Sequence, residues 1–206
     1  QVLVVGDDQQ VTPEDVGIAQ QPVDNLIKQY LKDIPSSALY DGRASMYELA
    51  SVSFDKKVIL TDHFRCVEPI IKFSSDLCYS GNLSCLRDIK DASVGPPTIE
   101  LNVKGIKEND LNEEEAVTIA SLITACIEQP EYEGLTFGMI SMLGRSRQHQ
   151  RVQELLMRSL DPKVYDDRKI LCGTPSHFQG GERDVVFIST VDSPDPNGGP
   201  LPRRGD

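Results

Sequence analysis

Polar and charged side chains gather in four short stretches of the 206-residue sequence, each next to an apolar run. The first is Gly6-Asp7-Asp8-Gln9-Gln10, which directly follows the apolar residues 2–5. Carboxylates and amides at the end of a buried strand are typical of the edge of an active site. A strand followed by an ordinary polar turn explains this stretch equally well, so both interpretations stay open.

The second stretch places an arginine just after an apolar run. Arg65 follows the run 58–61 and stands immediately before a predicted helix. A guanidinium group suits phosphate oxygens because it binds them through two parallel hydrogen bonds. Arg65 is therefore either a phosphate clamp or a common surface charge.

The third stretch, G-T-P-S-H-F-Q-G-G-E-R-D at 173–184, is the most specific. It places hydroxyl, imidazole and amide groups, two glycines and an E-R-D triplet between the apolar runs 169–172 and 185–190. Glycine allows the backbone to approach a ligand closely. A long polar turn does not explain this density of chemical groups.

The fourth stretch, G-R-S-R-Q-H-Q-R at 144–151, is a basic patch at the predicted start of a helix. Helix N-termini and arginines together favour phosphate, although an isolated charge run is usually a solvated face. The formal net charge of the chain is −11, which argues against a free-standing nucleic-acid-binding module. A local basic track remains compatible with that charge.

Alternating strands and helices are predicted to position these stretches. Near-continuous apolar runs, typical of strands buried on both faces, occupy residues 2–5, 58–61, 98–101, 136–141, 169–172 and 185–190. Helical periodicity marks residues 23–34, 46–50, 67–77, 112–127 and 152–160. The pattern predicts an α/β fold with a mostly parallel sheet, in which ligands collect at the carboxyl ends of the strands.

Composition narrows the class of protein further. The five cysteines and three histidines show no metal-ligand spacing, so no metal site is predicted. The longest apolar runs are too short to cross a bilayer, and no basic-then-apolar leader is present. We expect a soluble, cytoplasmic protein with reduced thiols and no membrane partner.

Together the four stretches resemble motifs of superfamily-one helicases, in the branch that contains DNA-end-processing and RNA-surveillance helicases. VVGDDQQVTP resembles motif three, LTDHFRCVEPIIKFSSDLCYSGNL motif four, and ILCGTPSHFQGGERDVVFISTV motif five with its extension. FGMISMLGRSRQHQRVQELL resembles the family's strand-loop-helix segment with a glutamine on the helix. The bacterial members are the most similar, and they often carry a nuclease domain further along the chain.

The resemblance implies a RecA-like, P-loop NTPase-type three-layer sandwich. Residues 1–13 match the last strand and motif three of a first RecA-like domain, 14–57 a helical connector, 58–192 the second RecA-like domain, and 193–206 a flexible end. The sequence contains no G-x-x-x-x-G-K-[ST] loop, no Asp-Glu pair before motif three and no motif six. We therefore expect a fragment of a longer chain that is inactive as an ATPase by itself.

The resemblance also implies roles for individual residues around ATP and magnesium. Gln10 and Arg65 match the catalytic glutamine and arginine finger, and Glu182, Gly180 and Asp7 match nucleotide-binding positions. The positions implied for single-stranded DNA or RNA are Thr174, Ser176, His177, Arg145, Gln148 and Ser189.

Two alternatives to an ATP-dependent helicase or translocase stay open. The first is a RecA-like domain that binds or docks partners without catalysis. The second is a phospho-receiver domain with Asp62 as phosphoacceptor and Lys104 as its lysine. Against the second, Gly6 stands where a first acidic residue is needed, and Thr12-Pro13 interrupts the helix that should follow.

Overall fold

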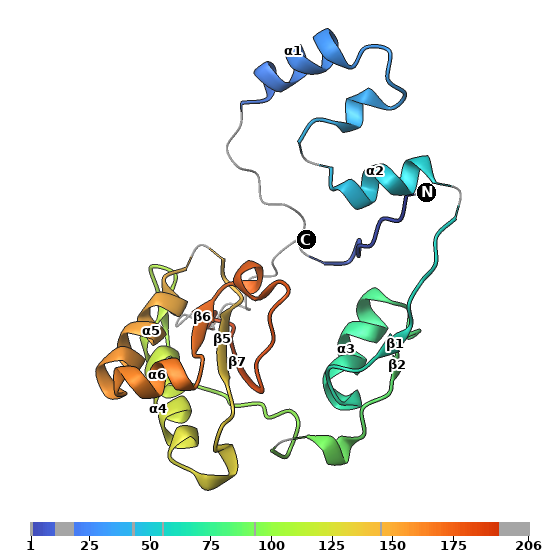
Figure 1. The fold of residues 1–206 in the computed structure, drawn as a ribbon. Helices are drawn as coiled ribbons and strands as arrows, with labels where there is room; N and C mark the ends of the chain where they lie inside the picture. The colour runs from blue at the N-terminus through green and yellow to red at the C-terminus, as the bar shows by residue number, and fades with distance from the viewer. Residues whose placement is uncertain are drawn as a thin grey trace. The chain divides into compact units, whose positions relative to one another are not determined.

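The computed structural model describes residues 2–10, 19–42, 44–54, 56–92, 94–144 and 146–193 (Figure 1). The backbone divides into two compact units. The first comprises residues 1–62 and 74–84, and the second comprises residues 63–73 and 85–206. Arg145 and the predicted flexible end beyond residue 193 lie outside the described residues.

The first unit is mainly helical. It contains α1 (Gln20–Tyr30), the 3-10 turn η1 (Ser37–Leu39) and α2 (Met46–Ser53). Helix α2 begins with a capping box, in which the Glu48 backbone N–H donates to Ser45 Oγ at 3.2 Å and the Ser45 N–H donates to the Glu48 carboxylate at 2.6 Å. The strand predicted at residues 2–5 is wrong, since this segment is unpaired and its apolar side chains are mostly exposed.

Residues 62–85 form a short strand pair and one helix. β1 (Asp62–His63) pairs with β2 (Ser84–Cys85), and α3 (Glu68–Cys78) lies between them in sequence. The Leu86 N–H donates to the His63 carbonyl at 2.8 Å. The predicted strand at 58–61 is displaced, because pairing starts at Asp62 and the apolar run before it stays exposed.

A three-stranded parallel sheet forms the centre of the second unit. β5 (Phe137–Ser141) lies between β6 (Leu171–Gly173) and β7 (Val185–Ser189), with Met139 opposite both Cys172 and Phe187. The predicted α/β class with a mostly parallel sheet is therefore confirmed. The strand predicted at 98–101 is not formed, and Ile99 is 76% exposed. A small antiparallel pair, β3 (Lys107–Glu108) and β4 (Leu111–Asn112), follows instead.

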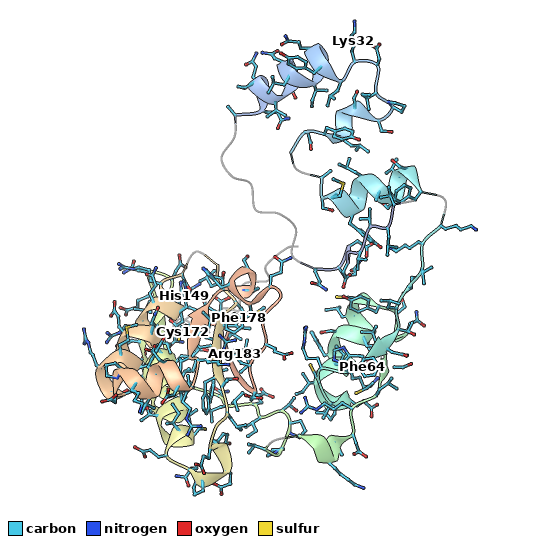
Figure 2. The ribbon with its side chains drawn as sticks, viewed as in Figure 1. Lys32, Phe64, His149, Cys172, Phe178 and Arg183 are labelled. Atoms are coloured by element: carbon cyan, nitrogen blue, oxygen red, sulfur yellow. The ribbon has the colours of Figure 1, made fainter. Side chains whose placement is uncertain are left out.

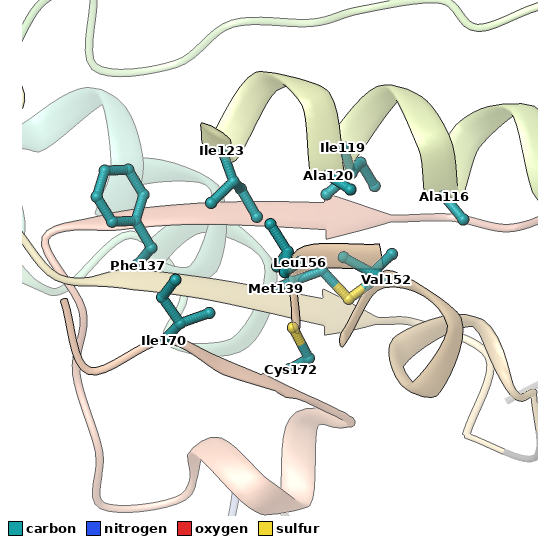
Figure 3. Close-up of a cluster of buried hydrophobic side chains, with 10 residues drawn as sticks. All are labelled: Ala116, Ile119, Ala120, Ile123, Phe137, Met139, Val152, Leu156, Ile170 and Cys172. Atoms are coloured by element: carbon teal, nitrogen blue, oxygen red, sulfur yellow. The ribbon is translucent and has the colours of Figure 1, made fainter. Parts of the chain in front are cut away.

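Helices pack on this sheet and enclose the hydrophobic core. α4 (Glu113–Ile127) and α5 (Gln148–Ser159) contact each other and the sheet, and α6 (Pro162–Asp167) follows α5. The remaining 3-10 turns are η2 (Ile89–Asp91), η3 (Pro130–Tyr132) and η4 (Pro175–Phe178). The buried apolar side chains, drawn in Figure 3, are Ala116, Ile119, Ala120, Ile123, Phe137, Met139, Val152, Leu156, Ile170 and Cys172.

No helix among the described residues is both long and apolar enough to span a bilayer.

Candidate functional site

The Gly6–Gln10 stretch is organised around the carboxylate of Asp7. Its Oδ2 accepts hydrogen bonds from Tyr79 Oη at 2.6 Å and from Gln10 Nε2 at 2.9 Å, and its Oδ1 accepts from the Gln9 N–H at 3.0 Å. Burial would raise the pKa of Asp7, but these hydrogen bonds outweigh it and lower that pKa. Burial and the bond to Asp7 raise the pKa of Tyr79 to about 12. Asp7 is thus an anion that holds the Gln10 amide.

The neighbouring residues of this stretch are also fixed within the first unit. A Cβ on Gly6 would lie 2.6 Å from Tyr47 Cδ2, so a residue without a side chain is required. Asp8 forms an ion pair with Lys57 at 3.2 Å, and the Lys57 ammonium lies 5.3 Å from the centroid of the Tyr47 ring. The two adjacent carboxylates are therefore engaged by different partners.

In the second unit, the structure brings together two residues that the sequence assigns to a nucleotide. Arg65 Nε lies 3.1 Å from the Glu182 carboxylate, and the side chains are 61% and 72% exposed. The Arg65 backbone carbonyl accepts a hydrogen bond from the Arg87 guanidinium at 2.6 Å. The guanidinium of Arg65 and the carboxylate of Glu182 are consequently both accessible to a ligand.

The sequence predicts that the polar site residues lie at the carboxyl ends of the strands, but Glu182 does not. It precedes β7 at the amino edge of the sheet, where Arg183 Nε donates to the Lys169 carbonyl at 2.7 Å. Asp184 Oδ2 accepts from both the backbone N–H and the hydroxyl of Thr136, at 2.8 and 2.7 Å. These bonds lower the pKa of Asp184. Arg183 and Asp184 therefore anchor the segment that carries Glu182.

The glycine and aromatic positions of the same segment serve its conformation. A Cβ on Gly138 of β5 would lie 2.7 Å from Phe178 Cε1, so Phe178 packs directly on the sheet. Gly180 adopts a φ of 74°, which glycine accommodates without steric cost. The glycines of this segment indicate an unusual backbone conformation, but the sequence does not show that Phe178 and Arg183 hold the segment against the sheet.

Three other predicted residues, Thr174, Ser176 and His177, lie at the carboxyl edge of the sheet. After β6, the Thr174 N–H donates to His177 Nδ1 at 3.1 Å, and Thr174 Oγ1 lies 2.9 Å from the same nitrogen. The half-buried Ser176 lies between them in η4. The centroid of the His177 ring is 6.0 Å from the centroid of the His149 ring. His149 lies at the start of α5, and the sequence predicts no individual role for it.

Gln148 is enclosed in the protein, which corrects its predicted contact with nucleic acid. Its side chain is fully buried; Oε1 accepts from the Asn112 N–H at 2.9 Å, and Nε2 donates to the Asn112 carbonyl at 3.0 Å. Asn112 in turn caps α4 by accepting from the Glu115 N–H at 3.1 Å. Gln148 therefore joins the starts of α4 and α5.

Ser189 is likewise enclosed rather than exposed to a nucleic acid. The residue is fully buried, and its Oγ has no hydrogen-bond partner among the described residues. It stands opposite Ser141 in the sheet, whose Oγ lies 2.8 Å from Ser146 Oγ. Its burial leaves Ser189 inaccessible to a nucleic acid, which corrects the predicted contact.

Within the described part of the chain, no group of three or more histidine, cysteine, aspartate or glutamate residues is arranged to hold a metal ion. The nucleotide candidates Gln10 and Asp7 belong to the first unit, and Arg65, Glu182 and Gly180 to the second.

Comparison with models of known protein families gives a match over most of the chain. The family model described as an AAA domain matches residues 42–201. This range covers the Arg65 segment, the α5 segment and the E-R-D stretch. None of the curated proteins matches the sequence.

Proposed function

Because the chain belongs to the AAA-domain family of the superfamily-1 helicase type, we propose that it is part of an ATP-dependent helicase or translocase acting on single-stranded DNA or RNA. The family assignment gives the general class, a helicase-like nucleotide-binding domain with a RecA-like α/β fold. The finer proposal is that residues 58–192 supply the second half of an ATP site. The P-loop half would come from sequence other than these 206 residues, which contain no G-x-x-x-x-G-K-[ST] loop.

The observation that carries this proposal is the accessible pair of Arg65 and Glu182, 3.1 Å apart. Phosphoryl transfer requires positive charge at the γ-phosphate and a positioned water molecule. The exposed Arg65 guanidinium fits phosphate oxygens, and the Glu182 carboxylate fits the hydroxyls of a ribose. In this proposal the phosphate takes the place of Glu182 as the partner of Arg65.

ATP with magnesium would supply the γ-phosphoryl group, whose transfer to water would release the free energy for movement. Arg65 stabilises the negative charge that develops in the transition state. Gln10 responds to the γ-phosphate, with its amide held by Asp7. Since Asp7 and Asp8 are engaged by protein groups, we propose that magnesium is held by the nucleotide phosphates and by residues other than these two.

The proposed nucleic-acid track is smaller than the sequence suggested. Thr174, Ser176 and His177 at the carboxyl edge of the sheet remain its members, and Arg145 remains a candidate from the sequence. The burial of Gln148 and Ser189 removes both from the track. A small track agrees with the net charge of −11, which disfavours extensive wrapping of nucleic acid.

The test is ATP hydrolysis by the complete protein, with and without single-stranded DNA, beside Arg65→Ala and Arg158→Ala variants. Arg158 is an exposed arginine on α5 and serves as the matched control. We expect single-stranded DNA to stimulate hydrolysis in the wild type and in Arg158→Ala. In Arg65→Ala, hydrolysis should fall by about 10³-fold or more, which is the magnitude of an arginine finger.

Each negative result has a different meaning. Hydrolysis that survives Arg65→Ala would show that Arg65 is not the finger. Absence of hydrolysis in the wild-type protein would favour the non-catalytic binding or docking domain. The family match spans Asp62 and Lys104 within an AAA domain, which argues against the phospho-receiver alternative.

A further inference from the structure

A tyrosine without a predicted role holds the carboxylate of Asp7. Tyr79 Oη donates to Asp7 Oδ2 at 2.6 Å, and Gln10 Nε2 donates to the same oxygen at 2.9 Å. All three residues belong to the first unit. One carboxylate oxygen thus joins the tyrosine hydroxyl to the glutamine that is proposed to respond to the γ-phosphate.

The backbone of Tyr79 is fixed by the end of α3. Its N–H donates to the Ser75 carbonyl at 3.0 Å, and the Gly81 N–H donates to the same carbonyl at 2.8 Å. Gly81 has a φ of 72°, and a left-handed residue just after a helix commonly satisfies the last carbonyls in this way. Ser75 is buried, and its Oγ accepts from the Leu83 N–H at 3.2 Å. The tyrosine is therefore presented from a hydrogen-bonded turn.

The bond between Tyr79 and Asp7 joins a neutral hydroxyl to an ionised carboxylate. Burial and the hydrogen bond to Asp7 raise the pKa of Tyr79 to about 12, so its hydroxyl keeps its proton at neutral pH. Burial opposes ionisation of Asp7, but the hydrogen bonds that it accepts lower its pKa overall. A hydrogen bond to an ionised acceptor is stronger than one between neutral groups. The Tyr79 hydroxyl is thus a strong restraint on the carboxylate.

The carboxylate in turn fixes the orientation of the Gln10 amide. An ionised carboxylate only accepts hydrogen bonds, so the Gln10 atom that lies 2.9 Å from Asp7 is the amide nitrogen. The Oε1 acceptor and the second N–H of the exposed Gln10 side chain remain for other partners. A water molecule that attacks a phosphate needs a group that accepts its hydrogen bond, and an amide oxygen is such a group.

From these contacts we infer that Tyr79 is a positioning residue of the ATP site, which acts through Asp7 on Gln10. The inference rests on the proposed function and adds a residue that does not itself contact ATP. Without the Tyr79 hydroxyl, Asp7 loses a donor from outside its own loop, and the Gln10 amide is held less firmly. The chemical step then slows, whereas the contacts that bind ATP stay. Loss of Tyr79 should therefore affect kcat more than KM.

The experiment measures hydrolysis of radiolabelled ATP, in the presence of single-stranded DNA, by the complete protein and by Tyr79→Phe, which keeps the aromatic ring and removes the hydroxyl. We expect kcat to fall by about tenfold, since misplacing a catalytic group costs up to about 100-fold, and KM for ATP to change by less than about twofold. Tyr30→Phe is the matched control, because Tyr30 is 69% exposed at the end of α1, two residues before Lys32, which is labelled in Figure 2. It should retain the wild-type kcat and KM.

A double substitution separates positioning from a general structural effect. Gln10→Ala removes the group that Tyr79 is inferred to position, so adding Tyr79→Phe to it should change the residual kcat by less than about twofold. Asp7→Asn breaks the same link from the other side, because an amide supplies one acceptor oxygen where a carboxylate supplies two. It should reproduce the fall in kcat, and it tests the inference even where Tyr79→Phe does not fold. Thermal unfolding shows whether each variant is folded.

An unchanged kcat in Tyr79→Phe, beside an inactive Arg65→Ala, would overturn this inference and leave the proposed function intact. An equal fall in kcat in the wild-type and Gln10→Ala backgrounds would also overturn it, because Tyr79 would then act independently of Gln10. A raised KM with unchanged kcat would overturn it as well, since Tyr79 would then support ATP binding and not the chemical step. Absence of hydrolysis in the wild-type protein would remove the proposed function together with the inference.

Discussion

Replacing Gln148 with alanine is expected to lower the free energy of unfolding of the second unit by about 3 kcal/mol. The side chain is fully buried, and Asn112, with 3% of its surface exposed, supplies both of its partners. The substitution breaks the bonds of 2.9 and 3.0 Å and leaves the buried Asn112 N–H unpaired, whereas the Asn112 carbonyl, at the N-cap of α4, still accepts the first bond of that helix. The unpaired N–H costs about 1–3 kcal/mol and the lost second bond about 1 kcal/mol, and water entering the space that Gln148 vacates would recover part of this cost.

The assay is thermal and urea unfolding of the wild type beside Gln148→Ala and Gln150→Ala. Gln150 lies two residues further along α5 and is exposed, so its replacement should change stability by less than about 0.5 kcal/mol. For a protein of this size, a loss of about 3 kcal/mol corresponds to a decrease in Tm of roughly 6–12 °C.

A loss below about 1 kcal/mol in Gln148→Ala would refute this reasoning. Unchanged stability together with weaker oligonucleotide binding would support the role that the sequence suggested for Gln148, a direct contact to nucleic acid.

Two further substitutions test the anchoring of the E-R-D segment. Because the pKa of Asp184 is lowered in the folded state, its stabilisation is present above the unfolded pKa of about 3.9 and is lost as pH falls through the folded pKa. Urea unfolding at about pH 7 and about pH 3 should therefore show a smaller loss of stability in Asp184→Asn than in wild type. The difference between the two proteins should be less than about 1 kcal/mol, because the group is exposed. Gly138→Ala should destabilise by about 1–3 kcal/mol in thermal unfolding, because its Cβ would displace Phe178.

Both substitutions have clear contrary outcomes. An Asp184→Asn variant with the same acid sensitivity as wild type would show that the bonds to Thr136 do not depend on the charge. A Gly138→Ala variant as stable as wild type would show that stability does not depend on the packing of Phe178 against Gly138. Gly134→Ala is an unsuitable control despite open space around its Cβ, because Gly134 has a φ of 76°.

The helices and the central strands could be predicted because their apolar residues follow regular periods. The predicted helix at 112–127 agrees with α4, and the apolar run 136–141 became β5. The runs at 2–5, 58–61 and 98–101 have the same composition but are not strands here. A strand needs a neighbouring strand that pairs with its backbone N–H and C=O groups. The sequence of an apolar run does not show whether such a neighbour is present.

Contacts between distant segments limited the prediction of the site. The sequence places Asn112 and Glu115 at a helix start with the spacing of a capping box, and the Asn112 half is formed. The carboxylate of Glu115 instead accepts hydrogen bonds from the N–H groups of Thr190 and Val191, at 3.1 and 3.0 Å. Gln148 was assigned to nucleic acid from the family resemblance, and a glutamine at a helix start gives no local sign that its side chain is buried against Asn112.

The order of strands in the sheet also has a consequence for how the second unit folds. β5 comes first along the chain, yet it pairs with β6 and β7 only after α5 and α6 have been traversed. Loop closure over such separations is entropically costly and slows folding, whereas α4 and α5 form from local contacts. We therefore expect the two helices to associate early and the strand edges to stay open until residue 189 is available, so this unit should be most prone to aggregation late in its synthesis.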